Sequence, residues 1–342
     1  MAHEPADAPM TAQGPGLVCA HHHLYSSLAR WLPGPARTPL GFLEVLELLW
    51  WRLDVALTPA DIAWSARLGA VEALEAGCTA IVDHHESPAA IDGSLDVIAE
   101  ACAEVGVRVV CAYGVTDRHG AGGAKAGLAE NERFLRAGGR GLVGVHASFT
   151  CSDDTLEAAA GLATDLDVGV HVHVAEGEGD TWPRLARLAD ERWLLAHGVH
   201  LPDHHGLAGT IVHNPRSNMN NGVGYARPAR FANPVALGTD GIGADLLEEA
   251  RLAFARLREH DATAPPTVTW AWLEQGWALV PEAQADIVTW SDEPGVFATG
   301  VRAVDVVVAG EVVLSEGRTT RVDADEVRAR AAEQAASLAG RW

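Results

Sequence analysis

Lysine is almost absent from this sequence, and positive charge is scarce throughout. Among 342 residues, 25 are Lys or Arg and 46 are Asp or Glu, so the formal net charge is −21, and Lys125 is the single lysine. DNA, RNA and anionic membrane surfaces are bound by clustered positive charge. We therefore expect neither nucleic acid nor membrane as a partner, and a small-molecule substrate instead.

Cysteine is also sparse, and its pattern excludes a disulfide framework. The five cysteines are odd in number and form no C-x-x-C pair: Cys19, Cys78, Cys102, Cys111 and Cys151. The first twenty residues lack the basic and apolar regions of a signal peptide, and no apolar run is long enough to span a membrane. These absences predict a protein of the reducing cytoplasm.

Several familiar catalytic motifs are missing, including H-E-x-x-H, G-x-S-x-G, G-x-x-x-x-G-K-[ST] and G-x-G-x-x-G. What is present is a globular composition, with 48% hydrophobic and 21% charged residues, and 16 histidines. Such a density of histidine in an acidic chain indicates metal binding or acid–base chemistry.

Short β-branched runs recur about every thirty residues, which is the spacing of βα units. We expect eight strands, at 17–23, 79–85, 108–115, 141–149, 168–176, 194–200, 209–218 and 235–241. Helical patterns lie between most of them; one begins with Thr58 as N-cap, Pro59 at the first position and Asp61 at the third. The alternation predicts a (β/α)₈ TIM-type barrel over 15–262.

The pattern changes after the barrel. Valine-rich segments over 283–318 predict the strands of a small, truncated β-sandwich side unit, and 323–340 predicts a C-terminal helix.

Polar residues stand at the ends of the expected strands, where a barrel builds its active site. His21 and His23 end the first strand, on one face because side chains alternate. An H-x-H pair alone is more often two hydrogen-bonded histidines than a metal site. The further polar residues at three other strand ends favour a site: His173 and Glu176, His197 and Asp240.

Other polar or aromatic residues near these strand ends allow two interpretations. Asp83, His84 and His85 are better explained as hydrogen-bonding partners of the site than as ligands. At least one of Trp50 and Trp51 is better explained by core packing, although a tryptophan there could cover a flat ring. Arg118 either positions a substrate group or pairs with the surplus acid.

Several segments resemble the metal-dependent amidohydrolase superfamily, and within it the aminohydrolase/chlorohydrolase branch. The segments are PGLVCAHHHLYSSLAR, HVHVAEG, LAHGVHL, NPRSNMNNGVG and LGTDGIGAD. LLWWRLDVALTPADI, VDHHESPAAIDGSLDVIAEA and GVTDRHG are most similar to the SsnA-like aminohydrolases. The resemblance runs from about Pro15 to Leu247 and resumes near Ala285.

The resemblance implies a mononuclear metal site and a set of catalytic residues. His21, His23, His173 and Asp240 would bind one divalent ion, Zn²⁺ in preference to Fe²⁺. Glu176 would shuttle protons, Asp240 would accept the proton of the attacking water, and His197 would polarise the substrate or orient the water. His146, Asn218, Trp51 and Arg118 are the expected substrate contacts.

The chemistry of these residue types agrees with that reading. Three imidazoles and one carboxylate leave Zn²⁺ an open position, and zinc lowers the pKa of bound water from 15.7 towards about 7. The hydroxide would attack an sp² carbon, and Glu176 would then protonate the departing amine. Binuclear members bridge two metals with a carboxylated lysine at a strand end; Lys125 lies in a glycine-rich segment between strands, which disfavours such a site.

The chain departs from the family in two places. Only sixteen residues precede Leu17, and 261–284 looks shortened. The valine-rich strands would then lack their usual N-terminal partners, and an unpaired edge must be covered, so we expect a homodimer. The alternative is that residues 1–16 fold over this edge, although their polar, proline-containing composition makes a poor strand.

Three functional hypotheses remain at this stage. The leading one is deamination of an amino-substituted heterocycle of purine, pterin or triazine type. Hydrolysis of a cyclic or linear amide is the nearest alternative, because the same hydroxide attacks either carbon. A catalytically silent, metal-stabilised partner subunit is the third, against which the presence of both Glu176 and His197 argues.

Overall fold

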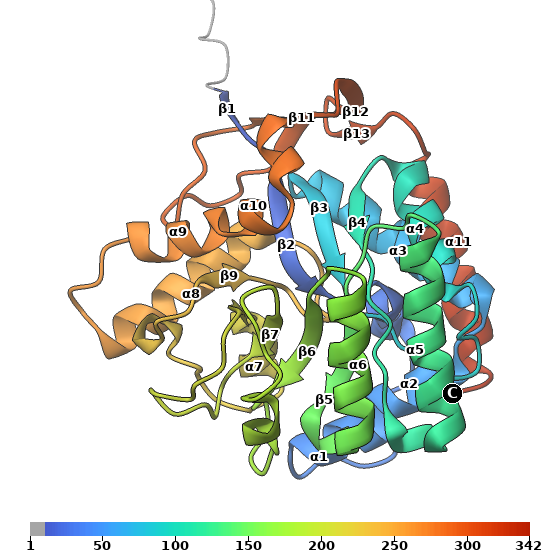
Figure 1. Cartoon of the computed structure of the whole chain (residues 1–342). Helices are drawn as coiled ribbons and strands as arrows, with labels where there is room; N and C mark the ends of the chain where they lie inside the picture. Colours follow the sequence, from blue (N-terminus) through green and yellow to red (C-terminus); the bar gives the residue numbers. More distant parts are fainter. Residues whose placement is uncertain (1–10) are drawn as a thin grey trace, which may run out of the picture.

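The computed structural model describes residues 11–342, and its centre is a barrel of eight parallel strands (Figure 1). The strands are β2 (Leu17–His22), β3 (Cys78–Asp83), β4 (Arg108–Val110), β5 (Val143–Ala147), β6 (Val170–Val174), β7 (Leu194–His197), β8 (Thr210–His213) and β9 (Val235–Leu237). They form sheets in the orders β2-β3-β4 and β5-β6-β7-β8-β9.

Parallel bridges join the two sheets at both seams. Cys111 pairs with Gly141 and Val115 with Val145 between the first sheet and β5, and His22 pairs with Asp240 beyond β9. The eight strands thus close on themselves, which confirms the expected (β/α)₈ barrel. The strands are shorter than expected; β6, for example, covers Val170–Val174 where 168–176 was expected.

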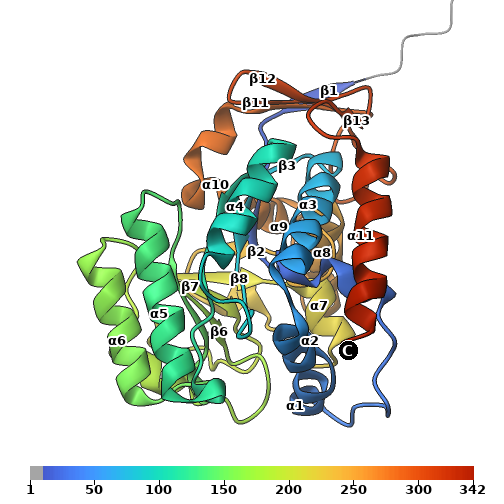
Figure 2. The same cartoon turned by 90° about the vertical axis from the view of Figure 1, so that its right-hand side faces the viewer.

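Helices surround the barrel and follow most of the strands (Figure 2). They include α3 (Pro59–Glu75), α4 (Ser94–Val105), α5 (Gly120–Arg136), α6 (Asp153–Asp165) and α8 (Leu246–His260). The expected start of α3 is present as a full capping box between Thr58 and Asp61, and Ser152 caps α6. An expected strand over 209–218 is wrong beyond His213, because Pro215 begins the short helix α7 (Pro215–Asn220).

A chain segment between β2 and α3 lies at the carboxyl ends of the strands. It contains the 3₁₀ helix η1 (Leu24–Trp31), α1 (Phe42–Val45), the π-helical turn η2 (Leu46–Trp50) and α2 (Trp51–Ala56). In both overall views α1 and α2 lie at the end of the molecule opposite the C-terminal sheet. The segment therefore covers the end of the barrel where the polar residues gather.

The sheet at the other end is antiparallel, with the order β1-β10-β11-β12-β13. Its strands are β1 (Ala12–Gly14), β10 (Ile287–Trp290), β11 (Ala303–Val308), β12 (Glu311–Ser315) and β13 (Arg318–Thr319). The helices α9 (Thr267–Glu274) and α10 (Gly276–Leu279) and the 3₁₀ turn η7 (Pro281–Ala285) lead into it, and α11 (Ala324–Ala339) packs along α3.

The sequence predicted an unpaired edge for this sheet, and at β10 this prediction is wrong. Ala12, Gln13 and Gly14 pair with Trp290, Thr289 and Val288. A polar segment can serve here because the pairing uses main-chain hydrogen bonds and needs no apolar side chain. Residues 1–10, which belonged to the same expectation, lie outside the described residues.

Inside the barrel, small apolar side chains fill the half away from the site. They include Val18, Ala20, Ala80, Val82, Val212 and Ala236, with Val280 and Ala283 behind them. A larger apolar cluster packs the barrel against its helices. Among residues 11–342, no helix is both long and apolar enough to cross a membrane.

Candidate metal centre and active-site pocket

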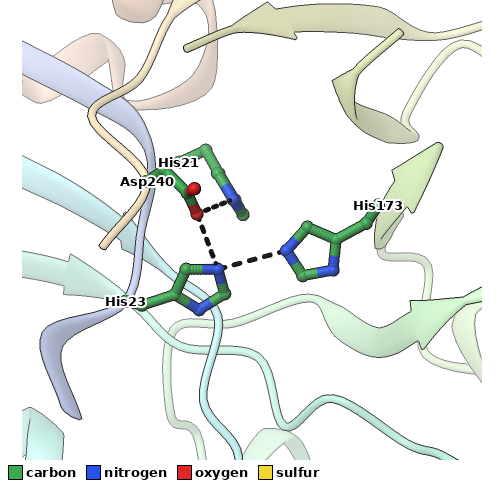
Figure 3. Close-up of side chains that lie close together, drawn as sticks. All are labelled: His21, His23, His173 and Asp240. Atoms are coloured by element: carbon green, nitrogen blue, oxygen red, sulfur yellow. Dashed lines mark hydrogen bonds and ion pairs between the residues drawn. The ribbon is translucent and has the colours of Figure 1, made fainter. Parts of the chain in front are cut away.

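Four side chains converge where β2, β6 and β9 end: His21, His23, His173 and Asp240 (Figure 3). His23 Nε2 lies 3.0 Å from Asp240 Oδ1 and 3.1 Å from His173 Nε2, and His21 Nε2 lies 3.3 Å from the same Asp240 oxygen. All four side chains are buried. The structure thus brings together the four residues expected to bind the metal.

The outer nitrogen of each ring is held by a neighbour. His23 Nδ1 lies 2.6 Å from the carbonyl oxygen of His84, and His173 Nδ1 lies 2.6 Å from that of His146. A carbonyl only accepts, so each Nδ1 carries a hydrogen, and a ring that is neutral presents an unprotonated Nε2 to the centre. His21 Nδ1 pairs with His171 Nε2 at 2.8 Å.

Two such nitrogens 3.1 Å apart repel each other unless positive charge lies near them. Burial lowers the pKa of His21 and His173 well below the usual value, so both rings are neutral. Burial alone would also lower the pKa of His23, but the Asp240 carboxylate raises it to about 9. The site therefore attracts a cation, and three imidazoles with one carboxylate are a donor set that fits a divalent metal ion.

Asp240 is held in place from several sides. Ser217 Oγ donates to its Oδ2, and His22 Nδ1 lies 2.7 Å from its carbonyl oxygen. Its backbone is left-handed, with φ +54°, as it is at Ala175 (φ +48°) and His197 (φ +75°) beside the ends of β6 and β7. Such conformations cost free energy for residues with a Cβ and concentrate at functional sites.

Glu176 and His197 lie beside this cluster. His197 Nε2 is 3.5 Å from Glu176 Oε2, and both offer atoms within 4.8 Å of an Asp240 oxygen. Burial raises the pKa of Glu176 to about 7, although His197 opposes the shift. Asn221 Nδ2 contacts Glu176 Oε1 at 3.5 Å.

Asn218 is not where it was expected. Its side chain is buried behind His197, whose Nδ1 donates to Asn218 Oδ1 at 2.8 Å, and it does not line the pocket. The segment is helical rather than a loop, which turns Asn218 inward and leaves Ser217 and Asn221 on the pocket side.

A pocket lies over the cluster; the space in it, including the solvent at its open mouth, is about 690 Å³. His146 and Trp51, two of the expected substrate contacts, line it, and so does Trp50. Further aromatic and apolar lining comes from Phe42, Leu46 and Phe149. The pocket therefore combines a polar floor with walls suited to a flat ring.

Arg118 is placed behind this wall. Its Nη2 contacts Asp54 Oδ2 at 3.1 Å and also Glu86 Oε2, and its guanidinium lies 4.5 Å from the centre of the Trp51 ring. Of its two interpretations, the structure shows pairing with acidic side chains. Asp54 and Glu86 both line the pocket, and the sequence reasoning missed them although Glu86 directly follows the D-H-H run.

The residues at the end of β3 and directly after it support the site without joining the cluster. Asp83 Oδ1 accepts from the Leu24 N–H at 2.7 Å, and His84 Nε2 contacts the Val145 carbonyl at 3.1 Å. Lys125 is exposed on α5. Because it is the single lysine, no lysine can bridge two metals at this site.

Comparison with known proteins places this geometry in a family. The sequence pattern of the amidohydrolase family matches residues 14–313. The chain belongs to the amidohydrolase family. This confirms the resemblance seen in the sequence motifs, and the His₃Asp cluster of this amidohydrolase lies within the matched residues.

Relatives and structural neighbours of this amidohydrolase include several deaminases. A 5-methylthioadenosine/S-adenosylhomocysteine deaminase of Syntrophomonas wolfei is 29% identical over 388 residues, covering 96% of this chain and 87% of that protein. An 8-oxoguanine deaminase of Pseudomonas aeruginosa is 29% identical, covering 80% and 73%. An adenosine deaminase of Xanthomonas campestris, solved with bound zinc, superposes with a TM-score of 0.82 at 22% identity, covering 96% and 86%.

Proposed function

We propose that this amidohydrolase releases ammonia from an amino-substituted heterocycle of purine type. The observation that carries the proposal is the position of Glu176 and His197 beside the His₃Asp cluster and beneath a pocket with aromatic walls. A cluster that only stabilised the fold would need neither residue. The deaminase names of the relatives support a purine or a related ring as the substrate.

His21, His23, His173 and Asp240 would hold one divalent ion. Zn²⁺ suits three imidazole nitrogens and a carboxylate, and the Xanthomonas campestris neighbour was solved with bound zinc. When bound, such an ion lowers the pKa of a coordinated water and supplies a nucleophile at neutral pH.

The protein's own residues would move the protons and orient the ring. Glu176 carries a proton to the departing amino group, for which a pKa near neutrality is suited. His197, fixed by Asn218 through Nδ1, presents Nε2 to the pocket side where Glu176 lies. His146 and Trp51 would contact the flat ring from the pocket wall.

A cytoplasmic location and a homodimer complete the proposal. All five cysteines are unpaired and buried, which is typical of proteins in a reducing compartment. The dimer rests on the family resemblance, since β1 removes the unpaired edge that first suggested it.

The decisive experiment measures ammonia release from a panel of aminoheterocycles by protein of known metal content. The panel contains adenosine, 5′-methylthioadenosine, 8-oxoguanine, an aminopterin and an aminotriazine, and a cyclic amide is followed separately for ring opening. Glu176→Gln protein is the blank. We expect ammonia from at least one purine compound. If none is deaminated while a cyclic amide is opened, the amide hydrolase hypothesis replaces this one.

A further inference from the structure

Three polar side chains on α7 and its C-cap each contact a different residue of the site. The pairs are Ser217 Oγ with Asp240 Oδ2, Asn218 Oδ1 with His197 Nδ1 at 2.8 Å, and Asn221 Nδ2 with Glu176 Oε1 at 3.5 Å. One short helix thus contacts a proposed metal ligand, the proposed proton shuttle and the histidine beside it. The orientation of α7 therefore affects all three at once.

The sequence of α7 does not fix that orientation by itself. The helix has six residues, and its N-cap, Asn214, makes no side-chain capping bond. Helices this short are marginal on their own, and most of their stability comes from the surfaces that they pack against. The position of α7 is therefore set by contacts with other elements.

Arg216, the second residue of α7, makes several of these contacts. Its Nε donates to Glu249 Oε1 and its Nη1 to Glu248 Oε2, each at 2.9 Å, and its Nη2 donates to the carbonyl oxygen of Ile242. The backbone N–H of Arg216 also donates to Glu249 Oε2, at 3.1 Å. One residue thus joins α7 both to α8 and to the loop that carries Asp240.

Burial makes these contacts difficult to replace. Glu249 is fully buried, and the side chain of Arg216 is 24% exposed. Removing one partner of a buried ion pair leaves the other charge without compensation. A lysine could not serve all three acceptors, because its compact ammonium lacks the planar fork of a guanidinium.

We propose that Arg216, paired with the buried Glu249, is a positioning residue for the site. It orients α7, and α7 in turn holds Asp240, Glu176 and His197 in the arrangement that metal binding and proton transfer need. Arg216 does not line the pocket and is not one of the clustered metal ligands, so its effect passes through α7. The effect on turnover rests on the deaminase function proposed above, whereas the effect on metal affinity does not.

A second arginine of the chain provides a matched control. Arg133 on α5 donates through Nε to Glu130 Oε2 at 2.8 Å. Glu130 is buried and accepts from the Gly93 and Leu95 N–H groups at the start of α4. This is again an arginine on a buried glutamate that receives backbone N–H groups, but none of these four residues lines the pocket. Its loss shows what a purely structural role would do.

The test measures zinc dissociation constants, by competition with a chromophoric chelator, together with kcat and KM. Loss of a residue that supports metal ligands from outside typically costs about 10–100-fold in metal affinity or activity. We expect Arg216→Ala to lose at least about tenfold in zinc affinity and in kcat, with KM changed less than about threefold. Arg133→Ala should melt at a lower temperature than wild type and keep its zinc affinity and kcat.

Guanidinium ion supplies a second readout. Arg216 lines a cavity that opens to solvent beside Trp50 and Trp342, so a small cation can enter the space that Arg216→Ala leaves. At millimolar concentration, far below denaturing amounts, guanidinium should restore part of the zinc affinity and kcat of Arg216→Ala. Wild type and Arg133→Ala should not respond.

Zinc bound by Arg216→Ala as tightly as by wild type, an equal loss in Arg133→Ala, or no recovery with guanidinium would each overturn the proposal. If no compound releases ammonia, the deaminase function fails, while the zinc constants still decide the role of Arg216. Should Arg216→Ala not fold, Arg216→Lys takes its place. A loss of zinc affinity is expected there too, and a wild-type constant would overturn the proposal.

Discussion

A mutation at Glu176 can separate proton transfer from metal binding in this site. It lies beside Asp240 and His197 but outside the group of four side chains suited to the metal. We predict that Glu176→Gln lowers kcat by about 10²–10⁴-fold, the usual contribution of a proton shuttle, and leaves metal content unchanged. Steady-state kinetics and elemental analysis check both parts.

Glu178→Gln, an exposed change two residues away, is the matched control and should behave as wild type. A Glu176→Gln protein that loses its metal, or that keeps full activity, would contradict the assigned role.

Glu86 links the stability of the fold to pH. An acid whose pKa is raised from 4.5 to about 8 in the folded state binds more protons when folded than when unfolded between these values. The free energy of unfolding therefore falls as pH rises through that window. We predict that wild type becomes less stable relative to Glu86→Gln between pH 5 and pH 8. Denaturant titrations at both pH values measure it, and a difference that does not change with pH, or changes in the opposite direction, would refute it.

At the scale of single residues, the sequence best predicts the positions of side chains that lie at the ends of strands. His21, His23, His173 and Asp240 could be placed together because parallel strands end at the same rim. Asn218 could not be placed, because its direction depends on the helix that Pro215 begins. Asp54 could not be predicted as a pocket residue for a similar reason. It lies on α2, whose position over the barrel is set by tertiary packing.

Among the elements, α3 has an N-terminus that also anchors the end of the chain. Asp61 is fully buried and accepts from the Thr58 N–H at 2.7 Å, from Gln334 Nε2 at 2.7 Å and from Arg341 Nη2 at 2.5 Å. A single carboxylate thus caps α3 and ties it to α11 and the residues that follow.

Because removing one partner leaves the others unpaired, we predict that Asp61→Ala lowers the free energy of unfolding by about 3 kcal/mol or more. Asp153→Ala, at the first position of α6 with a 60% exposed side chain, should cost less than about 1 kcal/mol. Chemical denaturation of both variants tests this, and equal losses would show that the buried contacts add nothing.

The helices and strands also show which parts of the fold sequence patterns can predict and which they cannot. The capping signal at Thr58 predicted the start of α3 because such signals act locally. The pairing of β1 with β10 brings together residues about 275 positions apart, and nothing in the sequence Ala-Gln-Gly of β1 distinguishes it from a loop. Main-chain pairing of this kind leaves little trace in side-chain composition.

For the molecule as a whole, the metal should connect the two sheets of the barrel. Its proposed ligands come from the ends of β2 in one sheet and of β6 and β9 in the other. We predict one metal per chain, and a loss of stability of about 3 kcal/mol on chelation if the ion is present at a hundred times its Kd. Elemental analysis showing two metals per chain, or a melting temperature insensitive to chelator, would contradict this.

The homodimer is the second prediction at this scale. Light scattering at micromolar concentration should give twice the 36.1 kDa mass of the chain. The outer face of the C-terminal sheet, with Ile287 46% and Val312 53% exposed, is where we expect charge-introducing changes to weaken it. A mass near 36 kDa at every concentration would reject the dimer.

The reactivity of the five buried cysteines can report where the folded protein opens transiently. Burial raises the pKa of all five thiols, to about 11 at Cys19 and about 12 at Cys151. Alkylating reagents attack the thiolate, so the folded molecule should react only through transient exposure. The five positions lie in β3, in α4 and at other sites around the first half of the barrel. The order in which they acquire an alkyl group, read by mass spectrometry, would therefore rank how readily each part of that half opens, without a label or a mutation.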